Sequence, residues 1–120
     1  MVSAKTSLII GGDGALGRAM VNVFRQGGWS VVNVAPNHNN EASANVLVDA
    51  KYPLKTQVSD IAYEVGKHSK SYDSILCVAG GFSCSSIKDE SIFETYDMED
   101  QRNFQTALLS GHLATQVLAP

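Results

Sequence analysis

The sequence has few of the features that would place it in a membrane, on a nucleic acid or in an oxidising compartment. Its 120 residues include two cysteines, three prolines and one tryptophan. The 9 lysines and arginines are outnumbered by 12 acidic residues, so the chain lacks the basic excess typical of nucleic-acid binding. No apolar run approaches the roughly 18 residues of a membrane span, and the first residues lack the pattern of a secretory signal. We therefore expect neither a nucleic-acid nor a membrane partner.

The two cysteines, Cys77 and Cys84, are too few for a disulfide framework. Their spacing is not C-x-x-C and no histidine lies at metal-ligand spacing beside them, so we predict no metal site. Scarce cysteine is typical of a reducing compartment. The sequence thus predicts a cytoplasmic protein whose two thiols are free and buried or half-buried.

Short apolar runs alternate with longer segments of helical periodicity. The run from Leu8 to Ile10 is too short for a helix and ends at glycine, which is typical of a buried strand. Gly27-Gly28 predicts a left-handed end to the helix that begins after the glycines at 11–17. The face of that helix is predicted to consist of Leu16, Met20, Val23 and Phe24. We predict strands over 5–10, 29–35, 45–49 and 73–79, and helices over 16–26, 55–67 and 97–117.

This alternation predicts an α/β fold in a single domain over residues 1–120. Because no hairpin turns join the strands, the sheet is expected to be parallel and doubly wound, with helices on both faces. The uniformly apolar segment 73–79 is predicted to be buried on both faces of the sheet. The chain stops after this fourth strand and the helix that follows it.

The most informative motif is GGDGALG at residues 11–17, between the first strand and the first helix. It contains G-x-G-x-x-G at Gly12, Gly14 and Gly17, and G-x-x-G-x-x-G when Gly11 replaces Gly12. Glycines permit the sharp turn, let the backbone approach a pyrophosphate and bring the helix close to the strand. The helix start then offers free N–H groups to phosphate. The alternative is a tight glycine turn without a ligand.

A second glycine segment, Ala79-Gly80-Gly81, closes the fourth strand. In a doubly wound sheet, ligands bind beyond the carboxyl ends of the strands where the strand order reverses. If the first and fourth strands flank that point, this segment and the loop at 11–17 meet around one ligand. The alternative is an ordinary turn between a strand and a helix.

Several stretches together resemble the short-chain dehydrogenase/reductase family, and within it the dihydropteridine reductase branch. They are GGDGALG (11–17), Trp29, NEASANVLV (40–48), YEVGK (63–67), DSILCVAGGFS (73–83), SIF (91–93) and SGHLATQVL (110–118). The resemblance implies a Rossmann-like fold and NADH-dependent reduction of quinonoid dihydrobiopterin to tetrahydrobiopterin, with NADPH as the alternative cofactor. It also implies a homodimer formed through the helix at 97–117. The alternative is an inactive form that binds nucleotide weakly or acts only through that interface.

The loop, the second glycine segment and the resemblance together predict a set of cofactor-binding residues. They are Gly11, Gly12, Gly14, Ala15, Leu16, Gly17, Ala35, Ala79, Gly80 and Gly81. No catalytic residue is assigned, because the family's Tyr-x-x-x-Lys pair belongs to a second half that residues 1–120 do not include. Tyr63 and Lys67 match that pattern by letters, but they precede the fourth strand and are predicted to lie on an outer helix.

The end of the second strand lacks the acidic residue that usually binds the adenosine ribose. Ala35 stands there, followed by Pro36 and Asn37, so Asn33 or Asn37 is left to bond a hydroxyl. Asp13 in the glycine loop would repel a 2′-phosphate, which favours NADH.

Four further predictions concern single residues. Asp49 either contacts adenine or caps a turn. Gln105, with Asn103 close by, falls where many short-chain reductases carry a mid-helix asparagine, and the alternative is a surface or helix-packing role. His112 is predicted to pack, and Asp97, Glu99 and Asp100 to favour a helix start.

Overall fold

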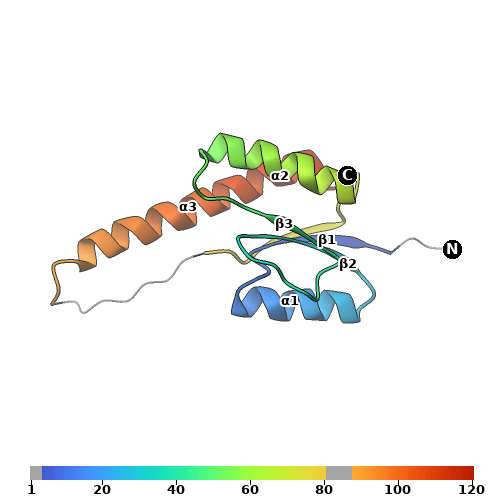
Figure 1. Ribbon diagram of the computed structural model, residues 1–120, viewed down its shortest axis with the longest axis horizontal. Helices are drawn as coiled ribbons and strands as arrows, with labels where there is room; N and C mark the ends of the chain where they lie inside the picture. The colour runs from blue at the N-terminus through green and yellow to red at the C-terminus, as the bar shows by residue number, and fades with distance from the viewer. Residues whose placement is uncertain (1–3, 81–87) are drawn as a thin grey trace.

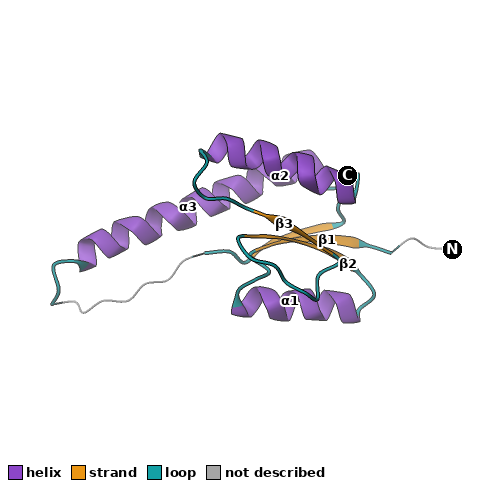
Figure 2. Ribbon diagram, in the orientation of Figure 1, coloured by secondary structure: helices purple, strands orange, loops and turns teal. Residues whose placement is uncertain are grey.

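A parallel sheet with helices on both faces organises the computed structural model, which describes residues 4–80 and 88–120 (Figure 1). Figure 2 shows the alternation of strands and helices along the chain. The strands are β1 (Thr6–Ile10), β2 (Ser30–Ala35), β3 (Ala44–Leu47) and β4 (Ser74–Cys77). The helices are α1 (Ala15–Gln26), α2 (Leu54–His68) and α3 (Ile92–Val117). The predicted Rossmann-like doubly wound fold is confirmed.

The strand order β3-β2-β1-β4 places the first strand beside the last, and every pairing is parallel. The chain runs outward from β1 to β3 and then crosses back to β4 on the other side of β1. The order therefore reverses between β1 and β4, as predicted. Ile10 is the register partner of Cys77, so the two strands end at the same level and their following loops leave together.

The two faces of the sheet have separate cores. One face packs against α1, with Ile9, Val21 and Val31 fully buried. The other packs against α2 and α3, where Ile61, Val65, Leu109 and Leu113 lie over the sheet. Figure 1 shows α1 on one side of the strands and the other two helices on the opposite side.

The packing face of α1 matches the predicted one in part, since Met20 and Phe24 pack against the core as predicted. Leu16 and Val23 are mostly exposed, at 62% and 67%, and Gly17 and Val21 are the buried positions. A glycine on the first turn brings the helix so close to the strand that the face containing Gly17 and Val21 becomes the contact. The predicted end of α1 is confirmed: Gly28 has φ +86° and Trp29 N–H donates to the Phe24 carbonyl at 3.0 Å.

Helix α3 begins at Ile92, five residues before the predicted start. The acidic run at Asp97, Glu99 and Asp100 therefore lies inside the helix, and Glu94 is the acid of its first turn. No proline or glycine interrupts residues 92–97, so the helix continues toward the N-terminus. Its first half extends beyond the sheet, and the described chain measures 61 × 29 × 23 Å (Figure 1).

Strand β4 is shorter and less buried than predicted. It ends at Cys77, its first three residues are half-buried, and the Cys77 thiol is exposed rather than buried. Within the described residues β4 pairs with β1 alone, so it is an edge strand with one open side. Cys84 lies outside the described residues.

Among the helices of residues 4–80 and 88–120, none combines the length and apolar character needed to cross a membrane.

Tyr72 joins the end of α2 to the start of β4. Its side chain is fully buried and its hydroxyl donates to the Val65 carbonyl at 2.7 Å. Burial raises the pKa of Tyr72 to about 12, from an ordinary 10.0. The folded chain therefore holds the neutral phenol while the unfolded chain ionises, so this contribution to stability is complete below pH 10 and is lost as pH rises toward 12.

We expect the free energy of unfolding to fall by about 2 kcal/mol through this residue between about pH 9 and about pH 11.5. Urea denaturation across that range measures the fall. Tyr72→Phe should remove this part of the pH dependence, whereas Tyr63→Phe on the exposed surface of α2 should retain it. An equally steep fall in Tyr72→Phe would contradict the assignment to Tyr72.

Candidate nucleotide-binding site

The glycine loop begins with a left-handed residue that brings the ends of β1 and β4 into contact. Gly11 has φ +96°, and its N–H donates to the Val34 carbonyl at 2.8 Å. A Cβ at Gly11 would lie 2.5 Å from the Ala79 nitrogen. The two glycine segments, 68 residues apart at Gly11 and Ala79, are therefore neighbours, as predicted from the strand order.

Gly12 and Gly17 are required by close packing, Gly17 against the loop itself and Gly12 against β2. A Cβ at Gly17 would overlap the Gly11 carbonyl oxygen and would lie 2.7 Å from the Gly12 Cα. A Cβ at Gly12 would lie 2.5 Å from Oδ1 of the buried Asn33. These glycines let α1 start directly above the end of β1.

Gly14 is the glycine that faces open space. It precedes α1 with extended backbone (φ −81°, ψ 176°), and a Cβ there would meet only the Gly11 oxygen, at 3.8 Å. No side chain caps the helix, so the N–H groups of its first turn, Ala15 to Gly17, have no partner within the helix. An open approach to free N–H groups at the positive end of a helix fits a pyrophosphate.

The second segment lies beside the glycine loop, at the end of β4. The Val78 N–H donates to the Ile10 carbonyl at 2.8 Å, and Ala79 then packs against Gly11. Gly80 is exposed, and a Cβ there would lie 2.9 Å from Oδ1 of Asn103 on α3. The mid-helix side chain that approaches Gly80 is therefore that of Asn103, and both Asn103 and Gln105 are exposed. Gly81, also predicted to bind cofactor, lies outside the described residues.

At the end of β2, Ala35 does not present a side chain to a ligand. It is 2% exposed, and its carbonyl accepts the Val48 N–H at 3.0 Å. Asn33 is buried and donates through Nδ2 to the Asn37 carbonyl at 3.2 Å and to Asn45 Oδ1 at 2.9 Å. Of the two asparagines predicted to reach a ribose, Asn33 is therefore enclosed and Asn37 is exposed.

A group of asparagines that sequence analysis did not connect holds the glycine loop to β2 and β3. Asn39, 5% exposed, donates through Nδ2 to the Gly12 carbonyl at 2.7 Å. Its Oδ1 accepts the Glu41 N–H at 2.9 Å, and Asn45 Oδ1 accepts the Asn39 N–H at 2.8 Å. The signal in the sequence was four asparagines between 37 and 45, which predicts turns but not their partners. Residues 41–43 form a turn, and Ala44 begins β3.

The remaining candidates are Tyr63, Asp49 and His112. Tyr63 is 68% exposed on α2, where the Lys67 ammonium lies 4.4 Å from its ring centroid and 3.2 Å from Glu64. Asp49 caps a turn by accepting the Lys51 N–H at 2.9 Å. His112 was predicted to pack but is exposed, with its Nε2 3.1 Å from Gln116 Nε2. One helical turn separates them, and both side chains line the hollow between α2 and α3.

Comparison with curated proteins finds relatives of this chain. The chain is similar to a dihydropteridine reductase from Dictyostelium discoideum, with 23% identity over 115 residues. The match covers 96% of this chain and 49% of the relative, so the chain spans about half the length of that protein. No protein-family model matches the chain.

Solved structures with the same fold include several short-chain dehydrogenases. The aldohexose dehydrogenase of Thermoplasma acidophilum has a TM-score of 0.75 at 21% identity, covering 93% of this chain and 43% of its own. A short-chain dehydrogenase family protein from Francisella tularensis has a TM-score of 0.72 at 19% identity, covering 97% and 47%. A Brucella ovis oxidoreductase of that family, in complex with partially ordered NAD, has a TM-score of 0.67 at 19% identity, covering 95% and 58%. The resemblance to this family inferred from the sequence is confirmed.

Proposed function

We propose that this chain carries the nucleotide-binding segment of an NADH-dependent oxidoreductase of the dihydropteridine reductase type. The reaction proposed for the whole enzyme is reduction of quinonoid dihydrobiopterin to tetrahydrobiopterin. This reaction regenerates tetrahydrobiopterin from its oxidised form. One observation carries the proposal: the glycine loop at the start of α1 lies against Ala79 at the end of β4. This is the place in a doubly wound sheet where dinucleotides bind.

In this proposal the residues of the chain bind and orient, and a bound nicotinamide cofactor supplies the hydride. The N–H groups of Ala15, Leu16 and Gly17 stabilise the pyrophosphate, with the positive end of α1 behind them. Ala79 and Gly80 border the other side of the crevice, beside Asn103. The proton donor expected from the family, a Tyr-x-x-x-Lys pair, is not provided by Tyr63 and Lys67 on α2.

Titration of intrinsic NADH fluorescence tests the nucleotide site. We expect Gly14→Val to weaken NADH binding at least about tenfold, or roughly 1.4 kcal/mol, because its side chain enters the open approach to the N–H groups. Its extended backbone tolerates valine, so the midpoint of unfolding should stay close to that of the parent chain.

Gly66→Val on α2 is the matched control, since a Cβ there meets nothing within 4 Å, and it should leave NADH affinity unchanged. Unaltered affinity in Gly14→Val would place the nucleotide elsewhere.

The activity assay is NADH oxidation with quinonoid dihydropterin. We expect no turnover by residues 1–120 alone and turnover by a chain that also contains a Tyr-x-x-x-Lys segment after α3. Turnover by residues 1–120 would overturn the assignment of catalysis to that segment.

A second candidate function rests on the exposed side chains of α3. Phe93 and Phe104 are 74% and 70% exposed, and Leu108 is 53% exposed beside a hollow of about 390 Å³ between α2 and α3. Such a surface suits a second copy of the chain, and we propose that the homodimer forms here. A chain that sediments as a dimer but binds no NADH at millimolar concentration would favour a purely structural role over the reductase.

A further inference from the structure

The second strand ends without a carboxylate, yet the structure brings one to the same place from the glycine loop. Residues 33–40 contain no acid, and Ala35 is buried. Asn37, two residues past the end of β2, donates through Nδ2 to Oδ2 of Asp13 at 3.0 Å. The contact spans 24 residues and places the Asp13 carboxylate beside the end of the strand.

Asp13 is held at two points. Arg18 on the first turns of α1 donates through Nε to the Asp13 main-chain carbonyl at 2.9 Å, while Asn37 holds the carboxylate. No hydrogen bond from the described residues reaches the second carboxylate oxygen, Oδ1. Asp13 is half-buried, so its charge is less screened than that of a fully exposed acid.

We infer that Asp13, positioned by Asn37, recognises the adenosine ribose and selects NADH over NADPH. The inference rests on the proposed nucleotide-binding function. A carboxylate accepts a hydrogen bond from the ribose 2′-hydroxyl, the role usually taken by an acid at the end of the second strand. It repels a 2′-phosphate in the same position.

The experiment compares the binding of ADP-ribose with that of 2′-phospho-ADP-ribose by calorimetry, so that the nicotinamide ring and turnover play no part. We expect the parent chain to bind ADP-ribose about tenfold or more tightly than the 2′-phosphorylated analogue. Asp13→Asn keeps an acceptor for Asn37 Nδ2 and removes only the charge, so the ratio of the two dissociation constants should fall to within about threefold. Asn37→Ala removes the partner that positions the Asp13 carboxylate, and it should also lower the ratio of the two dissociation constants.

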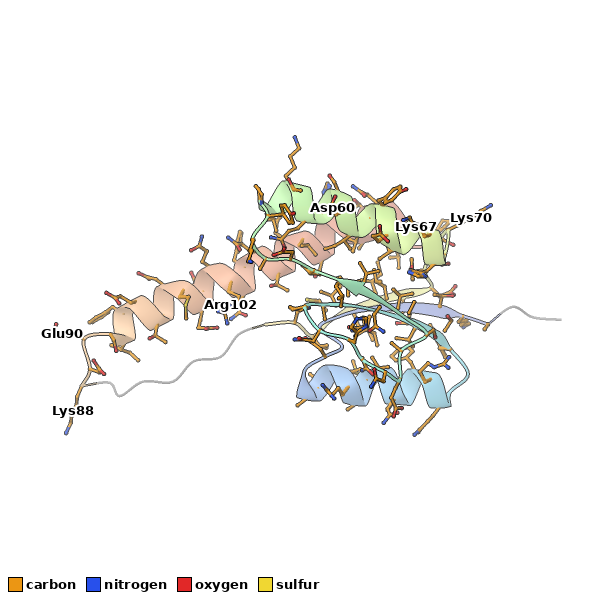
Figure 3. All side chains as sticks on the ribbon, viewed as in Figure 1. Asp60, Lys67, Lys70, Lys88, Glu90 and Arg102 are labelled. Atoms are coloured by element: carbon orange, nitrogen blue, oxygen red, sulfur yellow. The ribbon has the colours of Figure 1, made fainter. Side chains whose placement is uncertain are left out.

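Asp60→Asn is the matched control, because it removes the same charge from α2 on the other side of the sheet from α1 (Figure 3). Its ratio should equal that of the parent chain. If the parent chain binds ADP-ribose but Asp13→Asn leaves the ratio unchanged, or if the parent chain binds both analogues equally, the inference is overturned and the proposed function stands. If the parent chain binds neither analogue, both the inference and the proposed function are overturned.

Discussion

Gly17→Ala is expected to lower the free energy of unfolding by about 3 kcal/mol or more and to abolish NADH binding. A Cβ at this position would overlap the Gly11 carbonyl oxygen and approach the Gly12 Cα to 2.7 Å. These neighbours are main-chain atoms in a loop between β1 and α1, so no side chain can rotate away to make room. Relief requires α1 to move off the sheet, which also moves the N–H groups proposed to hold the pyrophosphate.

Denaturant unfolding followed by circular dichroism measures the stability loss, and NADH titration measures the loss of binding. Gly66→Ala is the matched control, since it makes the same substitution inside a helix with nothing within 4 Å of the new Cβ. That variant should gain roughly 0.5–1 kcal/mol, because alanine replaces glycine in a helix interior. A Gly17→Ala chain as stable as the parent would show that α1 does not depend on this close approach.

Asn39→Ala is expected to lower the free energy of unfolding by about 2–3 kcal/mol and to weaken NADH binding. The substitution removes the donor to the buried Gly12 carbonyl and the acceptor for the Glu41 N–H. A buried carbonyl without a partner costs about 1–3 kcal/mol, which makes the loss larger than that of an exposed hydrogen bond. The Gly12 main chain is then free to shift, and with it the geometry of the glycine loop.

Asn40→Ala, at the exposed neighbouring position, controls for the loss of an asparagine from this turn. We expect its stability within about 0.5 kcal/mol of the parent chain and its NADH affinity unchanged. The same unfolding curves and fluorescence titrations serve for both variants. Equal behaviour of the two alanine variants would show that Asn39 does not support the loop.

Sequence patterns predicted the strands and the glycine loop because their causes are local. The apolar run of β1 and the glycines that follow it specify a strand and then a turn within a dozen residues. Gly28 specifies the end of α1 in the same way, through a left-handed backbone that favours glycine. The order of the elements then restricted the sheet to a few parallel arrangements.

Periodicity was less informative where a helix or strand has more than one apolar face. On α1 the pattern favoured Leu16 and Val23, whereas the close approach at Gly17 turns Val21 to the core. On β4 the apolar run predicted burial on both faces, whereas an edge position leaves Cys77 exposed. Apolar spacing specifies neither outcome, because the first depends on how closely α1 approaches the glycine loop and the second on the place of β4 at the edge of the sheet.

The sequence by itself determined where the glycine loop proposed to bind phosphate lies in this protein, because a glycine turn followed directly by a helix start is a property of seven consecutive residues, 11–17. Only the tertiary structure decided which groups surround that loop. The contacts of Gly11 with Ala79, of Asn39 with Gly12 and of Asn37 with Asp13 join segments 24 or more residues apart. Such contacts follow from the order of strands in the sheet and from the crossing back to β4, which no local pattern specifies.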